Sequence, residues 1–137
     1  MVELSMRALE YEDYDELLVS WWKQWGWTPP PRDFLPKNGA GGLIVYYESI
    51  PVVAGFMYTT NSGIAWIEFI VSNKEFRLKP YRQQAIELLI DTLTKIAKNI
   101  GHKYGYAILK NKNLIDTYES LGYTKGDISS QEMIKHI

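Results

Sequence analysis

Residues 65–101 read AWIEFIVSNKEFRLKPYRQQAIELLIDTLTKIAKNIG, and this stretch decides the fold. Residues 65–71 are mostly apolar and predict a strand. Apolar residues then recur at steps of three and four, which predicts an amphipathic helix over Ala85–Ile100. Gly101 follows the last apolar turn and is a typical stop signal for a helix. A strand followed directly by a long helix is therefore the centre of the predicted fold.

A basic turn joins this strand to this helix. It contains Arg77, Lys79 and Arg82 around a single Pro80. The free N–H groups and the dipole at the start of a helix favour anions, so the turn indicates an anion-binding site. A solvated turn with no ligand is the alternative reading of the same residues.

The other elements are predicted from short apolar runs separated by turn residues. In chain order they are a strand at 2–9, a helix that ends at Gly26, strands at 43–47, 51–59 and 64–71, the long helix, a strand at 104–109, a helix at 114–121, and a closing hairpin of 123–125 with 132–135. This pattern predicts one α+β domain over residues 1–137. Its mixed, mostly antiparallel sheet has six or seven strands and three or four flanking helices, in the order β-α-(α)-β-β-β-α-β-α-β-β.

Composition limits the function further. The 137 residues carry a formal net charge of −1 and no cysteine, which excludes disulfides and thiolate chemistry and gives no general attraction to nucleic acid. No apolar run approaches the roughly 18 residues of a membrane span, and the first residues do not resemble a signal peptide. We therefore expect a soluble cytoplasmic protein without a membrane partner. His102 and His136 are isolated, so we expect no metal site.

Four tryptophans occur within residues 21–27, followed by a loop rich in proline and glycine. One interpretation is that they cap a small core. The other is that some of them line a pocket or a partner surface, because exposed aromatic residues seldom persist without a use. In that second case Glu12 and Asp13 would help to hold a cationic or planar amine.

Asn111, Tyr118, Gly122 and Tyr123 form a spaced pattern, with an Asn seven residues before a Tyr and a Gly–aromatic pair four residues after it. This spacing and the element order resemble the GNAT superfamily of acetyl-coenzyme-A-dependent N-acetyltransferases over nearly the whole chain. The resemblance implies that Asn111 lies beside acetyl-CoA and that Tyr118 protonates the departing thiolate. The alternative is that Tyr118 packs under the sheet and that Gly122 caps a helix.

The resemblance also implies how acetyl-CoA would be held. Backbone at Phe69, Ile70 and Val71 would pair with the pantetheine arm where the two halves of the sheet separate. The family's glycine-rich phosphate loop is degenerate here, because only Ala85 fits it. The expected contacts to the donor from this region are Arg77, Lys79, Arg82, Gln83, Gln84 and Ala85.

Glu68 is the candidate general base, because it is the one acid inside an apolar strand. Desolvation would raise its pKa toward a useful value. By strict alternation it shares a face with Trp66 and Ile70. The alternative is an ordinary carboxylate on the solvent side of the strand.

The acceptor is an amine that the sequence does not identify, and a homodimer stays open as the assembly. Two other functions stay open. The fold could serve as a binding or scaffold module with little catalysis, which the degenerate phosphate loop favours. An enzyme of mobile elements acting on nucleic acid is disfavoured by the net charge of −1.

Overall fold

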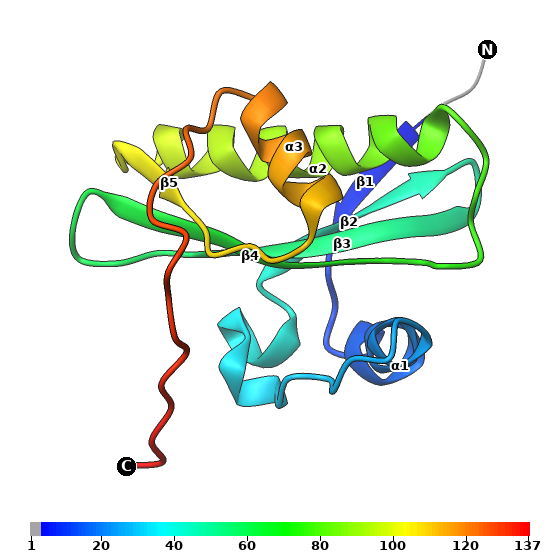
Figure 1. Cartoon of the computed structure of the whole chain (residues 1–137). Helices are drawn as coiled ribbons and strands as arrows, with labels where there is room; N and C mark the ends of the chain where they lie inside the picture. Colours follow the sequence, from blue (N-terminus) through cyan, green and yellow to red (C-terminus); the bar gives the residue numbers. More distant parts are fainter. Residues whose placement is uncertain (1–3) are drawn as a thin grey trace.

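The structure is a computed structural model that describes residues 4–137. A five-stranded sheet lies between two helical layers (Figure 1), with α2 and α3 on one face and α1 with two short 3₁₀ turns on the other. In chain order the elements are β1 (Leu4–Ala8), a π-helical turn η1 (Tyr14–Leu18), α1 (Val19–Gln24), the 3₁₀ turns η2 (Arg32–Phe34) and η3 (Pro36–Gly39), β2 (Gly42–Tyr47), β3 (Ile50–Tyr58), β4 (Ile64–Ser72), α2 (Tyr81–Asn99), β5 (Tyr104–Tyr106) and α3 (Lys112–Ser120). The predicted first strand is present as β1, and its residues 2 and 3 lie outside the described part.

The five strands follow one another in sequence order across the sheet. The first four pair antiparallel, and β5 pairs parallel to β4, with Ile64 opposite Tyr104 and Trp66 opposite Tyr106. The predicted α+β class, the mixed and mostly antiparallel sheet and the parallel neighbour of β4 are confirmed.

The predicted closing hairpin is wrong, and so is the count of six or seven strands. Residues 123–137 contain no strand, and their chain crosses the β4–β5 side of the sheet before its last part leaves the sheet (Figure 1). The reason is that β5 ends at Tyr106 rather than at Leu109, so it offers three paired positions and no long edge. The segment 132–135 also has only two apolar residues, and both are exposed.

The long helix packs on the sheet as predicted, but it begins at Tyr81, one turn before Ala85. Its buried side chains face β2, β3 and β4 and are Ala85, Leu89, Ile90, Leu93 and Ala97. Gly55 permits this close packing, because a Cβ there would collide with Ile70 and press on Leu89. The first helix is likewise less regular than predicted, since a π-helical turn precedes α1.

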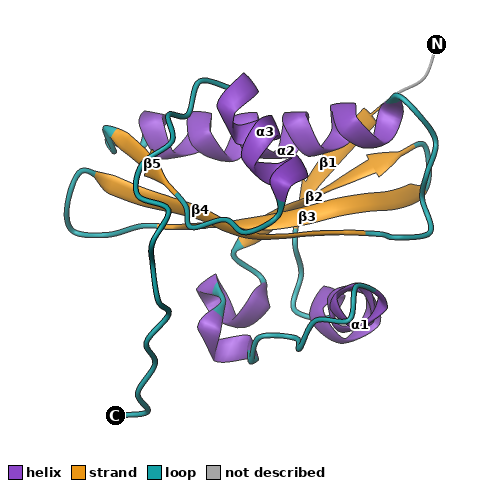
Figure 2. Ribbon diagram, in the orientation of Figure 1, coloured by secondary structure: helices purple, strands orange, loops and turns teal. Residues whose placement is uncertain are grey.

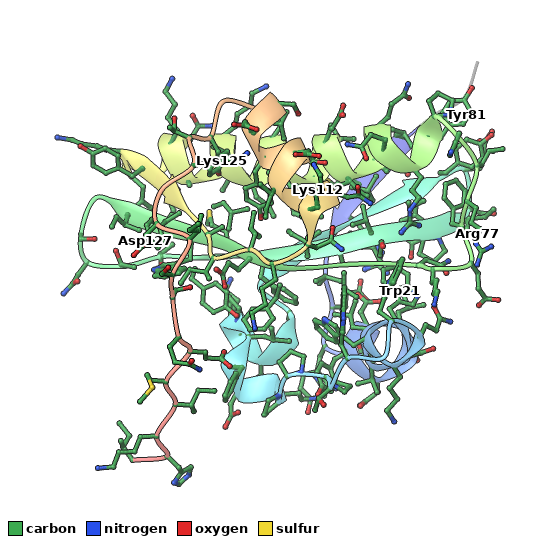
Figure 3. All side chains as sticks on the ribbon, viewed as in Figure 1. Trp21, Arg77, Tyr81, Lys112, Lys125 and Asp127 are labelled. Carbon is green, nitrogen blue, oxygen red and sulfur yellow. The ribbon has the colours of Figure 1, made fainter. Side chains whose placement is uncertain are left out.

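Trp21 and Trp22, in the layer formed by α1 and the two 3₁₀ turns, have a structural role. Trp21 and Trp22 are each 4% exposed and pack against the sheet, and Trp21 lies between α1 and the sheet in Figure 3. Asp13 is buried and accepts two hydrogen bonds from Arg7, at 2.7 and 2.9 Å. Because its charge is already paired, Asp13 does not supply the free carboxylate that an amine site needs.

Candidate functional site

A bulge lies in the middle of β4, at residues that the sequence analysis singled out. The pairing with β3 shifts by one residue there, and Phe69 has a φ of 54°, which non-glycine residues rarely adopt. The bulge turns Glu68 and Phe69 toward the same groove, while Ile70 packs against α2 on the opposite face. The expectation that Glu68 shares a face with Trp66 is confirmed, but the expectation for Ile70 is wrong because alternation breaks at the bulge.

Beyond Trp66, β4 has no paired strand on the β5 side. Figure 2 shows the chain after β5 running along the sheet before it turns into α3. Two side chains bond to the backbone here. The Tyr118 hydroxyl donates to the Ile67 carbonyl oxygen at 2.6 Å, and the Glu68 carboxylate accepts a hydrogen bond from the Ile108 N–H. The Tyr118 hydroxyl therefore bonds to the backbone of Ile67, the residue that precedes Glu68 in β4.

Glu68 has the electrostatics of a partly desolvated acid. Burial raises its pKa above the ordinary glutamate value, and the charge of Glu132 adds to this rise. The hydrogen bond from the Ile108 N–H acts in the opposite direction but is the smaller effect. In turn, burial first and then the Glu68 charge raise the pKa of Tyr58. Glu68 is thus a carboxyl whose proton affinity is increased, as a general base at neutral pH requires.

A groove of about 370 Å³ opens beside Glu68. Aromatic side chains dominate its lining, which consists of Phe34, Tyr58, Thr59, Thr60, Trp66, Glu68 and Phe69. Sequence reasoning missed Phe34 and Tyr58 as site residues. Tyr58 lies at the end of a predicted strand, and Phe34 lies in the irregular loop, so neither position carried a motif.

Tyr118 is 2% exposed, and its ring packs against Tyr123. Burial raises its pKa, so the phenol is protonated at neutral pH. Its hydroxyl already donates to Ile67, which is what the packing alternative expects. Ile67 is also the first residue of β4 beyond its pairing with β5. Its role as a general acid stays a prediction.

The three cations of the basic turn are not equivalent, because the Arg82 guanidinium is hydrogen-bonded within the loop. Arg82 donates to the Asn73 and Phe76 carbonyl oxygens at 2.8 and 2.7 Å, and to the Ser72 hydroxyl at 2.6 Å. Its guanidinium therefore holds the loop together. Arg77 and Lys79 are exposed on the same loop, and Figure 3 places Arg77 at its outer edge.

The other residues that were predicted to contact acetyl-CoA lie at separate places in the structure. Gln84 is exposed, whereas Ala85 is fully buried against the sheet. Gln83 links two helices, because its amide donates to Thr117 of α3 at 2.9 Å. Asn111 caps α3 by accepting a hydrogen bond from the Leu114 N–H at 3.1 Å.

Ile70 and Val71 continue β4 beyond its contact with β5, and both side chains are buried. Their backbone and that of Phe69 thus lie on the part of β4 that β5 does not pair. Among residues 4–137 there is no group of three acidic, histidine or cysteine side chains placed to hold a metal ion. Within the same range, no helix has the length and apolar character to cross a bilayer.

No protein family model matches the sequence. No curated protein matches it either. Solved structures do match in fold. A protein from meticillin-resistant Staphylococcus aureus, described as a probable acetyltransferase, superposes with a TM-score of 0.68 at 18% identity, over 99% of this chain and 100% of the other. Glucosamine-6-phosphate N-acetyltransferase from Arabidopsis thaliana gives 0.64 at 16% identity, over 97% and 99%.

N-acetylglutamate synthase from Neisseria gonorrhoeae, solved with coenzyme A and L-arginine, gives a TM-score of 0.70 at 13% identity. The match covers 90% of this chain and 28% of that longer one. At these identities the comparison concerns the fold alone. The chain has the fold of the GNAT N-acetyltransferases.

Proposed function

We propose that this chain is an N-acetyltransferase that moves the acetyl group of acetyl-CoA to an amine. The observation that carries the proposal is that the Tyr118 hydroxyl bonds to the carbonyl oxygen of Ile67, the residue next to Glu68 in β4, beside the bulge and the part of β4 that β5 does not pair. A base and a proton donor are the two groups that acyl transfer from a thioester to an ammonium requires. The fold shared with acetyltransferases supports the same reading.

In this proposal Glu68 accepts a proton from the bound ammonium, and the freed amine nitrogen attacks the acetyl carbonyl carbon. A C–N bond forms as the C–S bond breaks, and the Tyr118 hydroxyl gives its proton to the leaving sulfur. The nitrogen loses its second proton to water after the C–N bond has formed; of this proton and the one on Glu68, one restores the Tyr118 hydroxyl and the other passes through water to bulk. The net reaction converts an acetyl thioester and an ammonium into an amide, a thiol and one proton.

The residues fit acetyl-CoA unevenly. For the arm of the donor, backbone at Phe69, Ile70 and Val71 is free of β5 pairing. For its phosphates, the exposed Arg77 and Lys79 are the suitable cations, together with the start of α2. Arg82 would contribute to acetyl-CoA binding by holding the loop in shape. Backbone or helix position would be the contribution of Gln83, Gln84, Ala85 and Asn111. We also propose that residues 1–137 form one cytoplasmic acetyltransferase domain, with a homodimer as a further possibility.

The test is release of the coenzyme thiol, measured with purified protein, acetyl-CoA and a panel of primary amines. A reaction without amine gives the background from hydrolysis. Amine-dependent thiol release, with the acetylated amine identified by mass spectrometry, is the expected result. Acetyl-CoA at one hundred times its dissociation constant should also add about 2.7 kcal/mol of stability in thermal unfolding.

A binding module without turnover is the second candidate. It is favoured by one observation, namely that both key side chains already have backbone partners in this structure. Stabilisation by acetyl-CoA without thiol release for any amine would support this candidate and contradict the first.

A further inference from the structure

We infer that the groove beside Glu68 takes a small aromatic primary amine, with the ring among the aromatic side chains and the ammonium at Glu68. This inference rests on the proposed function, because it names the acceptor class for the same site.

The lining selects charge. Glu68 is the single charged side chain among the seven lining residues of the described chain, and none of them is Lys or Arg. Glu132 lies close enough for its charge to act on Glu68, so the local field is negative. An ammonium is attracted by this field, while a phosphate or carboxylate on the acceptor would meet no cation among these residues.

The lining also selects shape. Phe34, Tyr58, Trp66 and Phe69 supply four ring surfaces, against two threonine hydroxyls. A polyhydroxylated sugar would leave most of its polar groups unpaired here, which is costly. A planar ring with a short alkylamine arm buries its apolar face and places its cation near aromatic faces. A volume of about 370 Å³ accommodates such a molecule.

The aromatic walls are held in place before any ligand binds. The Tyr58 hydroxyl donates to the Phe34 carbonyl oxygen at 2.7 Å, so its ring, rather than its hydroxyl, is left for a ligand. Trp66 packs edge-on against Tyr106 at 4.6 Å. Preorganised walls lower the ordering cost of binding.

Arg32 fixes the outer wall. Its guanidinium lies over the Tyr11 ring at 3.7 Å, and it donates to the Asp15 carboxylate and the Asn38 carbonyl oxygen at 2.8 and 3.1 Å. These contacts tie η2, and with it Phe34, to η1 and to η3. The 44% exposed Phe34 is therefore a positioned residue at the mouth of the groove.

The test measures binding by calorimetry without acetyl-CoA, using three probes of similar size. Phenethylamine has the ring and the ammonium, cyclohexylethylamine lacks the aromatic face, and phenylacetate reverses the charge. We expect phenethylamine to bind about fivefold to tenfold more tightly than cyclohexylethylamine, and phenylacetate to show no binding. Phe34→Leu should weaken phenethylamine binding by a similar factor. Trp27→Leu, at a residue that is equally exposed (43%) but outside the groove, should leave it unchanged.

Thiol release with the same amines separates this inference from the proposed function. Binding of phenethylamine with no thiol release for any amine of the panel would keep the inference and contradict the proposed acetyltransferase activity. Acetylation of glucosamine-6-phosphate or glutamate, with no binding of aromatic amines, would keep the enzyme and overturn the inference. Equal affinity for phenethylamine and cyclohexylethylamine, or no effect of Phe34→Leu, would also overturn it.

Discussion

Replacing Tyr118 by Phe removes one hydroxyl from the proposed site and keeps the buried ring. The hydroxyl donates to the Ile67 carbonyl oxygen at 2.6 Å, and the side chain is 2% exposed. Its loss leaves a buried acceptor without that partner, which costs about 1–3 kcal/mol. For a domain of this length each kcal/mol lowers the melting temperature by about 3–4 °C. We therefore expect a decrease of roughly 3–12 °C.

The same substitution should lower turnover by roughly 10²–10⁴, the usual effect of losing a positioned proton donor. Both quantities are needed, since a purely structural tyrosine would change only the first. Turnover is measured as the initial rate of thiol release, at a temperature where unfolding curves show the variant fully folded. The dissociation constant of acetyl-CoA should stay the same, because the ring and the β4 backbone are unchanged.

Tyr123→Phe is the matched control. Tyr123 packs its ring against Tyr118 at 5.0 Å, and its hydroxyl shares a 2.7 Å hydrogen bond with Thr94 instead of β4. It should lose some stability and keep its rate. Normal turnover in a destabilised Tyr118→Phe protein would refute the acid role. Equal rate losses in both variants would show that the effect arises from packing.

Four more variants test the charges and the core. Glu68→Gln should abolish most turnover. As pH rises from about 4 toward neutrality, the unfolding free energy of the wild type should decrease relative to that of the Glu68→Gln variant. The raised pKa means that the folded state keeps its proton where the unfolded state has lost it; parallel urea-derived profiles would contradict this. Arg82→Ala should destabilise the fold by about 1.5–3 kcal/mol in urea titrations, since three hydrogen bonds are lost. The Arg77/Lys79 double alanine variant should instead weaken acetyl-CoA binding by at least about tenfold, with little change in stability. Unaltered affinity in that double variant would mean that the turn is only solvated charge. Gly55→Ala should cost about 1–3 kcal/mol by overpacking beneath α2, and an unchanged melting temperature would mean that this interface is looser than described.

The sequence best predicted the helices and strands that have a regular local pattern of apolar residues. The apolar steps after residue 84 place Ala85, Leu89 and Leu93 on one face, and all three are buried. The three consecutive strands were likewise recognisable from apolar runs and turn residues. In these segments tertiary packing favours the same secondary structure as the local sequence pattern, so the prediction and the structure agree.

The groove could not be predicted in the same way. Its walls come from η2 and from strands that lie more than twenty residues further along the chain, and the Tyr58–Phe34 hydrogen bond joins them only after folding. The bulge could not be predicted either, because phenylalanine is an ordinary strand residue and nothing in the local pattern indicates the positive φ of Phe69. Alternation therefore placed Ile70 on the wrong face, and with it the set of residues that surround Glu68.

Arg82 illustrates a further limit of composition. In the sequence, three cations around Pro80 are equivalent candidates for an anion. In the structure, Arg82 makes three hydrogen bonds to its own loop, and to bind a phosphate it would first have to give up bonds whose combined loss costs about 1.5–3 kcal/mol. Exposed Arg77 and Lys79 have no comparable cost and would lose mainly hydration and side-chain entropy. If acetyl-CoA binds here, its phosphates should therefore gain their charge from the outer edge of the loop, with Arg82 setting the shape of that edge.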